Sequence, residues 1–219
     1  MNQINETIDL DSNFILKSRT DETIEDIRNI PNGYKIRHKN CNIVFDKIIG
    51  EGSYGKVYLV YADNKKLALK LTNDGDECRL IQTYLTPYEI GLFYSKNNNS
   101  NPPFIKYLGS GSLFYNEKFY HYYLMPYYVQ SLSEFLKHSK DSIENIFFTI
   151  ALRIMNALGY LCSKNITHGD IKPSYILLKI ENNLDSCVLS DYGTSKFQPS
   201  FKNEKSVGTY MFMSLDAHL

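Results

Sequence analysis

The chain has 219 residues, which is enough for one large domain or two small lobes. Its 24 basic and 24 acidic residues cancel to a formal net charge of zero, which argues against a nucleic-acid partner, because such partners normally require a basic excess. The hydrophobic content of 43% is ordinary for a packed soluble protein.

Residues 1–40 are polar and weakly patterned. One short helix is expected in TDETIEDIRNI, where isoleucines recur every third residue behind acidic first-turn positions. We interpret this N-terminal extension as a surface helix or a mobile tail.

The pattern changes at Asn42, where strands begin. IVFDKIIG, KVYLVYA and NKKLALKLT read as three strands, and the glycine-rich EGSYG forms the turn between the first two. The following stretch, ECRLIQTYLTPYEIGLFYSK, has helical spacing, with Pro87 ending one helix or starting another.

The second half of the chain turns from strands to helices. FIKYLGSGSLFY and FYHYYLMPYY look like two more strands, and helices are expected in SLSEFLKHS and in the long SIENIFFTIALRIMNALGYLCSK. Two short apolar runs, YILLKI and CVLSDYG, follow. A β-rich N-terminal part followed by a helical C-terminal part predicts an α+β fold with two lobes and a hinge near Pro126.

Neither secretion nor membrane insertion is expected. MNQINETIDLDSNF has no basic segment followed by an apolar one, and the longest apolar stretch, IFFTIALRIMNALGYL, is interrupted by polar residues and too short to span a bilayer. The four scattered cysteines show no CxxC pair or metal-ligand spacing and suit a reducing compartment. We expect a location in the cytoplasm (that of the host, if the source is viral) or in the nucleus by diffusion.

Three glycines, Gly50, Gly52 and Gly55, form a G-x-G-x-x-G pattern between two predicted strands. A dinucleotide-binding fold would place the last glycine at the start of a helix, so this context argues against it. Between strands, the backbone amides can close over the phosphates of a nucleotide, with Val57 packed on the base. A hairpin that only needs positive φ angles would use glycine as well.

Lys70 ends the alternating stretch LALK, one hairpin after the glycine pattern. A lysine there can reach solvent, but it fits better as a ligand of the α- and β-phosphates, held by a carboxylate on the next helix. Glu89 is the preferred partner because it leads the helically spaced EIGLFYSK; Glu77 is the alternative.

The segment THGDIKPSYILL, followed by SDYG, carries the chemistry. Asp170 lies on a loop after the long helix and can accept a hydroxyl proton or orient that hydroxyl for attack. Lys172 can neutralise charge on a transferred phosphoryl group, and Asp191 is suited to hold Mg²⁺ between phosphates. Any one of them could be a solvated loop residue; their order and spacing together predict a phosphoryl-transfer site.

These motifs resemble the eukaryotic protein kinase family. GEGSYGKV, LALK, HGDIKPS, DYG and the late GTYMFMSLDAH carry the resemblance over roughly residues 43–219. HGD, DYG and the DAH ending are similar to the casein kinase 1 group, especially its vaccinia-related branch. The resemblance implies a bilobal kinase fold, with an N-lobe over 41–126, a partial C-lobe over 127–219, and ATP with Mg²⁺ as substrate and cofactor.

The resemblance also implies roles for individual residues. Asp170 would be the catalytic base, assisted by Lys172, and Asp191 the metal ligand. Lys172 and Thr209 would meet near the acceptor hydroxyl, which supports Ser/Thr selectivity. The nucleotide would be bound by Ile49, Gly50, Glu51, Gly52, Ser53, Tyr54, Gly55, Val57, Lys70, Glu89, the gatekeeper Met125 and the hinge residue Tyr128.

The chain departs from the family pattern in three places. Asp170 lacks the usual preceding arginine, so activity should not depend on a phosphorylated activation loop. Tyr175 occupies the position of an asparagine that ligates a second metal ion, and a neutral phenol is a poor Mg²⁺ ligand. The chain also stops at DAHL, where the resembled kinases continue, so we expect a fragment, a partner that covers the long helix, or marginal stability.

The sequence therefore predicts a weak Ser/Thr protein kinase that acts on a protein substrate. Small-molecule phosphotransferases that resemble aminoglycoside kinases share the HGD triplet, but they usually lack a lysine at the position of Lys172. The main alternative is a pseudokinase, a regulatory module that binds a nucleotide or a protein partner, and Tyr175 motivates it. We expect neither a nucleic acid nor a membrane as partner.

Overall fold

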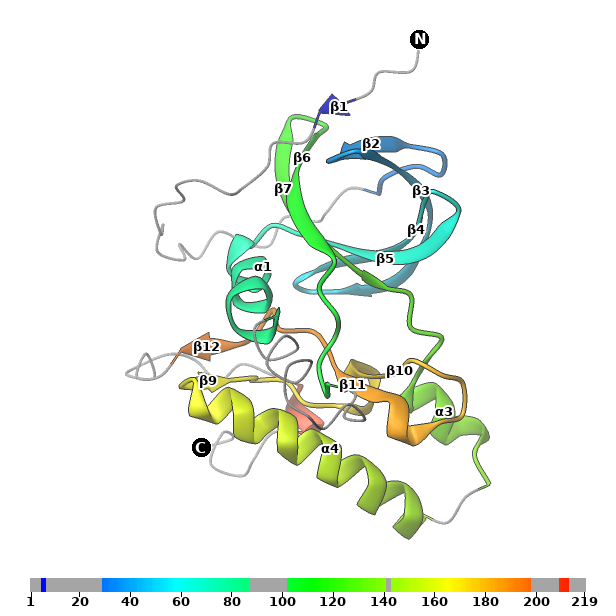
Figure 1. Cartoon of the computed structure of the whole chain (residues 1–219), viewed down its shortest axis with the longest axis vertical. Coiled ribbons are helices and arrows are strands. Elements are labelled where there is room, and N and C mark those ends of the chain that lie inside the picture. Colours follow the sequence, from blue (N-terminus) through cyan, green and yellow to red (C-terminus); the bar gives the residue numbers. More distant parts are fainter. Residues whose placement is uncertain (1–4, 7–28, 87–101, 141–142, 198–208, 213–219) are drawn as a thin grey trace. The chain divides into compact units, whose positions relative to one another are not determined.

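The computed structural model describes residues 5–6, 29–86, 102–140, 143–197 and 209–212. The chain divides into two compact units (Figure 1). Unit 1 comprises Met1–Arg79 and Tyr107–Tyr127, and unit 2 comprises Leu80–Lys106 and Tyr128–Leu219.

Unit 1 is built on one seven-stranded sheet with the order β1-β2-β3-β4-β5-β7-β6. All neighbouring strands are antiparallel except the parallel pair β1 and β2. The strands predicted from the alternating apolar pattern are confirmed as β3 to β7. The strand bounds are β1 Asn5–Glu6, β2 Lys35–His38, β3 Cys41–Gly52, β4 Gly55–Ala62, β5 Lys65–Thr72, β6 Gly109–Tyr115 and β7 Lys118–Pro126.

The core of unit 1 includes part of the predicted N-terminal extension. Ile30 is buried, and its backbone N–H donates to the Tyr58 hydroxyl at 3.1 Å. Ile36 on β2 is fully buried among the same strands, because β2 pairs with β3. Residues 29–38 therefore belong to the packed sheet, which corrects our interpretation of the whole 1–40 segment as surface helix or tail; most of the expected helix lies outside the described residues.

A short helical segment follows β5. It begins as α1 Gly75–Leu80 and continues as the π-helix η1 Ile81–Leu85, with Ile81 and Leu85 buried. The predicted helix over ECRLIQTYL is thus confirmed, whereas residues 87–101, including EIGLFYSK, lie outside the described part of the chain.

Unit 2 is mainly helical. Its elements are β8 Gln130–Ser131, α3 Leu132–His138, α4 Ile143–Ser163, β9 Ile166–Thr167, η2 Pro173–Tyr175, β10 Ile176–Leu178, η3 Leu184–Ser186, β11 Cys187–Leu189, β12 Lys196–Phe197 and η4 Tyr210–Phe212. Helix α3 begins with a capping box, in which Ser131 and Glu134 satisfy each other's backbone N–H groups. The helices predicted over SLSEFLKHS and the long apolar stretch are confirmed as α3 and α4.

Helix α4 packs one stripe of side chains against β9, β11 and η3. Arg153 stabilises this packing, because its Nε donates a hydrogen bond to the Cys187 carbonyl oxygen at 2.9 Å. The stripe repeats at the helical spacing of three and four residues, and its buried members are Ile146, Ile150, Ile154, Ala157 and Leu161.

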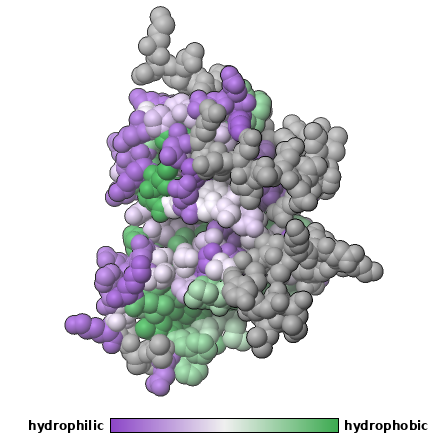
Figure 2. All heavy atoms as spheres, turned by 180° about the vertical axis from the view of Figure 1, so that it is seen from behind, coloured by the Kyte–Doolittle hydropathy of each residue, from purple (hydrophilic) through white to green (hydrophobic). Residues whose placement is uncertain are grey.

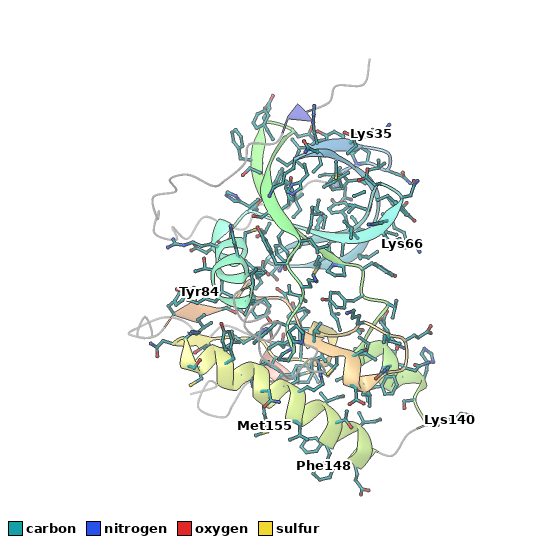
Figure 3. The ribbon with its side chains drawn as sticks, in the orientation of Figure 1. Lys35, Lys66, Tyr84, Lys140, Phe148 and Met155 are labelled. Atoms are coloured by element: carbon teal, nitrogen blue, oxygen red, sulfur yellow. The ribbon has the colours of Figure 1, made fainter. Side chains whose placement is uncertain are left out.

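The opposite face of α4 is apolar and exposed. Phe147, Phe148, Leu152 and Met155 are each 65–66% exposed. Phe148 and Met155 point away from the strands of unit 2 (Figure 3), and hydrophobic side chains gather on the surface of this unit (Figure 2).

By length and composition alone, Ile146–Ser163 could cross a membrane, so our expectation that this stretch is too short was wrong. Of that window, 28% is buried, and the packed stripe with Arg153 shows that one face of α4 packs within unit 2.

Candidate functional site

The glycine-rich turn joins β3 to β4 in unit 1, with Gly52 opposite Gly55. Gly55 has φ 154°, and a Cβ atom there would lie 2.4 Å from the Leu71 carbonyl oxygen on β5. Close approach of the strands therefore requires a glycine at this position even without a ligand. Gly50 lies opposite Val57, whose side chain is 3.5 Å from the position of a Cβ at Gly50.

The tip of this turn is exposed at Glu51, Gly52 and Ser53, and Tyr54 is half-buried. Glu51 forms an ion pair with Lys56 at 3.0 Å, and Lys56 also donates to the Asn29 side chain at 2.8 Å. Sequence reasoning missed this link, because nothing in the polar N-terminal pattern marks Asn29 as a partner of the turn.

Lys70 is buried and paired within unit 1. Its Nζ lies 2.8 Å from Glu77 Oε1, and the two side chains are only 4% and 1% exposed. The Tyr123 hydroxyl donates to the same carboxylate oxygen at 3.1 Å, from the residue opposite Lys70 on β7. The carboxylate partner is thus Glu77, our second choice, because α1 starts directly after β5. Glu89, our first choice, lies outside the described residues.

The other residues expected to contact a nucleotide are placed as follows. Met125 is buried on β7 opposite Ala68, and Ile49 on β3 is 40% exposed. In unit 2, the Tyr128 hydroxyl accepts a hydrogen bond from the Lys106 backbone N–H at 2.9 Å. Their roles as gatekeeper, loop residue and hinge residue stay predictions.

Asp170, Lys172 and Thr209 of unit 2 form a closed hydrogen-bond network. Lys172 Nζ donates to Asp170 Oδ2 at 2.9 Å and to Thr209 Oγ1 at 2.7 Å. The Thr209 backbone N–H donates to the second Asp170 oxygen at 2.8 Å. The predicted meeting of Lys172 with Thr209 is therefore confirmed, 37 residues apart in the chain.

This network keeps Asp170 ionised. Burial by itself raises the pKa of this carboxyl group, but the hydrogen bonds from Thr209 and Lys172 and the lysine charge outweigh it, so the pKa lies below the ordinary value of 3.8. A carboxylate of such low basicity orients a hydroxyl group by accepting its hydrogen bond, and it takes up the proton only late in a transfer.

The loop around Asp170 is held by backbone contacts that sequence reasoning missed. His168 Nε2 pairs with the Ser190 carbonyl at 3.0 Å, and the Thr194 hydroxyl donates to the His168 carbonyl at 2.9 Å. Gly169 has φ 88°, and a Cβ atom there would lie 2.8 Å from the Thr194 carbonyl oxygen. The glycine in HGD is therefore required both by its left-handed conformation and by this contact.

Asp191 follows β11 and has φ 61°, an uncommon angle for a residue other than glycine. The Gly193 backbone N–H donates to its Oδ1 at 3.4 Å. Its carboxylate is a suitable Mg²⁺ ligand if phosphate oxygens complete the coordination. Within the described residues, no group of three or more His, Cys, Asp or Glu side chains could hold a metal ion by itself.

Tyr175 does not fit as a second metal ligand. Its ring lies under the Lys172 ammonium, with Nζ 4.0 Å from the ring centroid. A cation already lies over the aromatic face, and a neutral phenol lacks the amide oxygen that Mg²⁺ prefers. The donor set thus suits one Mg²⁺ ion through Asp191 and does not suit a second ion through residue 175.

Comparison with known proteins adds a family to this geometry. Residues 43–216 match the family model described as protein kinase domain. The serine/threonine-protein kinase Sgk1-A of Xenopus laevis is 29% identical over 194 residues, which cover 80% of this chain and 40% of that protein. Sgk1-B of the same species is 31% identical over 174 residues, covering 72% and 35%. The chain spans about two fifths of the length of these curated relatives.

A solved structure, that of vaccinia related kinase 3, is also similar. The two share 19% sequence identity with a TM-score of 0.73, and the match covers 90% of this chain and 64% of that chain. At this identity the likeness shows the fold alone. It confirms the predicted α+β fold with a β-rich N-lobe sheet and helices.

Proposed function

The chain belongs to the protein kinase family, and from this premise we propose that it is a serine/threonine protein kinase of low turnover. The reaction would transfer the γ-phosphate of ATP to a hydroxyl group of a protein substrate. Relatedness to serine/threonine kinases supports the acceptor class. The HGD, DYG and DAH motifs support a place near the vaccinia-related branch of the casein kinase 1 group.

The observation that carries the proposal is the network of Asp170, Lys172 and Thr209. It holds an ionised carboxylate and an ammonium group 2.9 Å apart, on the loop where an acceptor hydroxyl would be oriented. The two side chains are only 19% and 6% exposed, and ionisable groups buried with a specific charge partner cluster at functional sites.

Each residue has a distinct task in this reaction. Lys70, held by Glu77, would bind the α- and β-phosphates. Asp170 would orient the attacking hydroxyl, and Lys172 would neutralise charge on the phosphoryl group in transit. One Mg²⁺ ion, held by Asp191, would neutralise the charge of the phosphates when bound.

Tyr175 accounts for the low turnover. The loss of one metal ligand removes transition-state stabilisation, and each loss of about 1.4 kcal/mol lowers the rate about tenfold. The same residue favours the second candidate function, a pseudokinase that binds a nucleotide or a protein without transferring phosphate.

Phosphate transfer tests the proposal directly. Radiolabelled ATP is incubated with casein, or with the protein alone, and the Asp170→Asn variant is the control. We expect incorporation by the wild-type protein and none above background by the variant; equal signals refute the catalytic claim.

Thermal unfolding with ATP separates the two candidates. Stabilisation by ATP that requires Mg²⁺ supports the enzyme, since Asp191 contributes to binding only through the metal. Stabilisation by ATP alone, or none at all, supports the regulatory module.

A further inference from the structure

The side chain of Tyr175 is the clearest departure of this chain from the family pattern, and the structure gives it a definite contact. We propose that Tyr175 is a positioning residue whose aromatic face holds the Lys172 ammonium in place against Asp170 and Thr209. The inference rests on the proposed function for its effect on rate, whereas the contact itself can be tested without any activity.

The local backbone brings the two side chains together. Lys172 precedes the 3₁₀ helix η2, and the Tyr175 backbone N–H donates to the Lys172 carbonyl at 2.9 Å. Lys172 itself has an extended backbone (φ −155°, ψ 161°), and the turn closed by this hydrogen bond brings the ring beside its ammonium group. Pro173 at the first position of η2 supports this turn by fixing its φ angle.

The backbone that carries the ring is fixed. The Tyr175 carbonyl accepts two hydrogen bonds from Ser190, from the backbone N–H at 2.9 Å and from the hydroxyl at 2.8 Å. The Ser190 carbonyl in turn pairs with His168. Tyr175 is therefore anchored to the same scaffold that shapes the HGD segment.

The Lys172 ammonium has three sites of attraction, which match its three N–H donors. Two are the oxygens of Asp170 and Thr209, and the third is the ring of Tyr175 at 4.0 Å. With the side chain only 19% exposed, water competes weakly for the ammonium, and an aromatic face attracts a cation more strongly in such surroundings. The ring thus restricts Lys172 to the position in which it meets both oxygens.

Trace acylation of lysines in the protein without ATP tests the contact. The acylation rate of Lys172 is measured by peptide mass spectrometry in the wild type and in Tyr175→Phe and Tyr175→Leu. Phenylalanine retains the aromatic face, so its rate should stay within about twofold of wild type, whereas leucine should raise the rate about threefold or more. Equal rates in the leucine variant and the wild type overturn the proposal, as does a phenylalanine variant that reacts like leucine.

Two controls separate a local effect from unfolding. The exposed Lys137 and Lys179 should keep their rates in every variant, and Tyr127→Leu, which removes a longer contact of 5.7 Å with Lys66, should leave Lys172 unchanged. If the leucine variant unfolds, a series of phenylalanines with increasing fluorination is placed at position 175. Each fluorine weakens the attraction of the ring for the ammonium group at nearly constant side-chain shape. Lys172 acylation should then rise with each fluorine; a flat series overturns the proposal.

Phosphate transfer gives the second readout. Tyr175→Leu should lower kcat with little change in the KM for ATP, and Tyr175→Phe should restore kcat. If the wild type, the leucine variant and the phenylalanine variant all transfer phosphate at the same rate, the inference is refuted and the proposed function stands. If the wild type transfers no phosphate, the proposed function fails, and the acylation rates alone decide whether Tyr175 holds Lys172.

Discussion

The ion pair of Lys70 and Glu77 offers the sharpest test of how unit 1 is stabilised. The two charged atoms are 2.8 Å apart, and both side chains are almost fully buried. The change Glu77→Gln keeps the shape of the side chain and an oxygen for the Tyr123 hydroxyl, but it removes the charge that faces the lysine. The perturbation is therefore electrostatic rather than steric.

The expected magnitude follows from burial. Removing one partner of a buried ion pair destabilises a protein by roughly 3–5 kcal/mol, because the remaining charge keeps its desolvation penalty. In a chain of this length, each kcal/mol lowers the midpoint of thermal unfolding by about 2–4 °C. We thus expect Glu77→Gln to unfold about 6–20 °C below the wild type.

Circular dichroism during heating measures this shift. Lys65→Met, at an exposed position of the same strand, is the matched control and should change the midpoint by no more than about 2 °C. The double variant Lys70→Met/Glu77→Leu replaces both charges by apolar groups and should recover most of the loss. An unshifted midpoint for Glu77→Gln would refute the reasoning, as would a double variant less stable than Glu77→Gln.

Two further predictions concern unit 2 and its comparison with unit 1. Gly33 and Gly169 have similar φ angles of 80° and 88°, but only Gly169 faces a neighbour, Thr194. Urea unfolding should therefore show a loss of about 1 kcal/mol for Gly33→Ala and about 3 kcal/mol for Gly169→Ala; equal losses would contradict the contact. The folded pKa of Asp170 lies below its ordinary value of 3.8, so its carboxylate contributes stability above that pH and loses it as the pH falls through the folded value. The difference in unfolding free energy between wild type and Asp170→Asn should be constant from about pH 8 to 5 and shrink below about pH 4; a difference that grows toward acid would be inconsistent with a lowered pKa.

The strands and helices that position the site could be predicted from periodicity. The apolar run KVYLVYA and the alternating stretch that ends in LALK marked strands, and the helical spacing in the long apolar stretch marked α4. These patterns are local: β4 and β5 are apolar runs with consecutive buried residues, whereas α4 buries one stripe and leaves the opposite face exposed. The glycines and the Asp170 loop were also predictable, since their residue types follow from local chemistry.

The partners of the charged groups could not be predicted in the same way. Glu89 led a stretch with good helical spacing, whereas Glu77 lies in the first turn of a six-residue helix that continues as a π-helix. Glu77 is placed as the partner of Lys70 by its contact with Tyr123, which is 46 residues away in the chain. A local sequence pattern cannot predict such a contact. Ile30 was missed for the same reason, because a single apolar residue in a polar segment gains its place in the core from the tertiary structure.

Tyr175 stands where the family pattern has an asparagine. This difference affects the second metal ligand, whereas the conformation of the loop is preserved. The backbone of residue 175 is bound through its carbonyl to Ser190, so the loop conformation does not depend on an amide side chain. The type of side chain at residue 175 then determines which cation it binds. An amide oxygen binds a divalent metal ion, whereas an aromatic face binds an ammonium group. Because Lys172 is fixed to Asp170 and Thr209 within the same unit, the ring acts on a cation that the chain itself supplies. The substitution therefore replaces a ligand for a second metal ion by a support for Lys172, which lowers the expected rate and leaves the geometry around Asp170 intact.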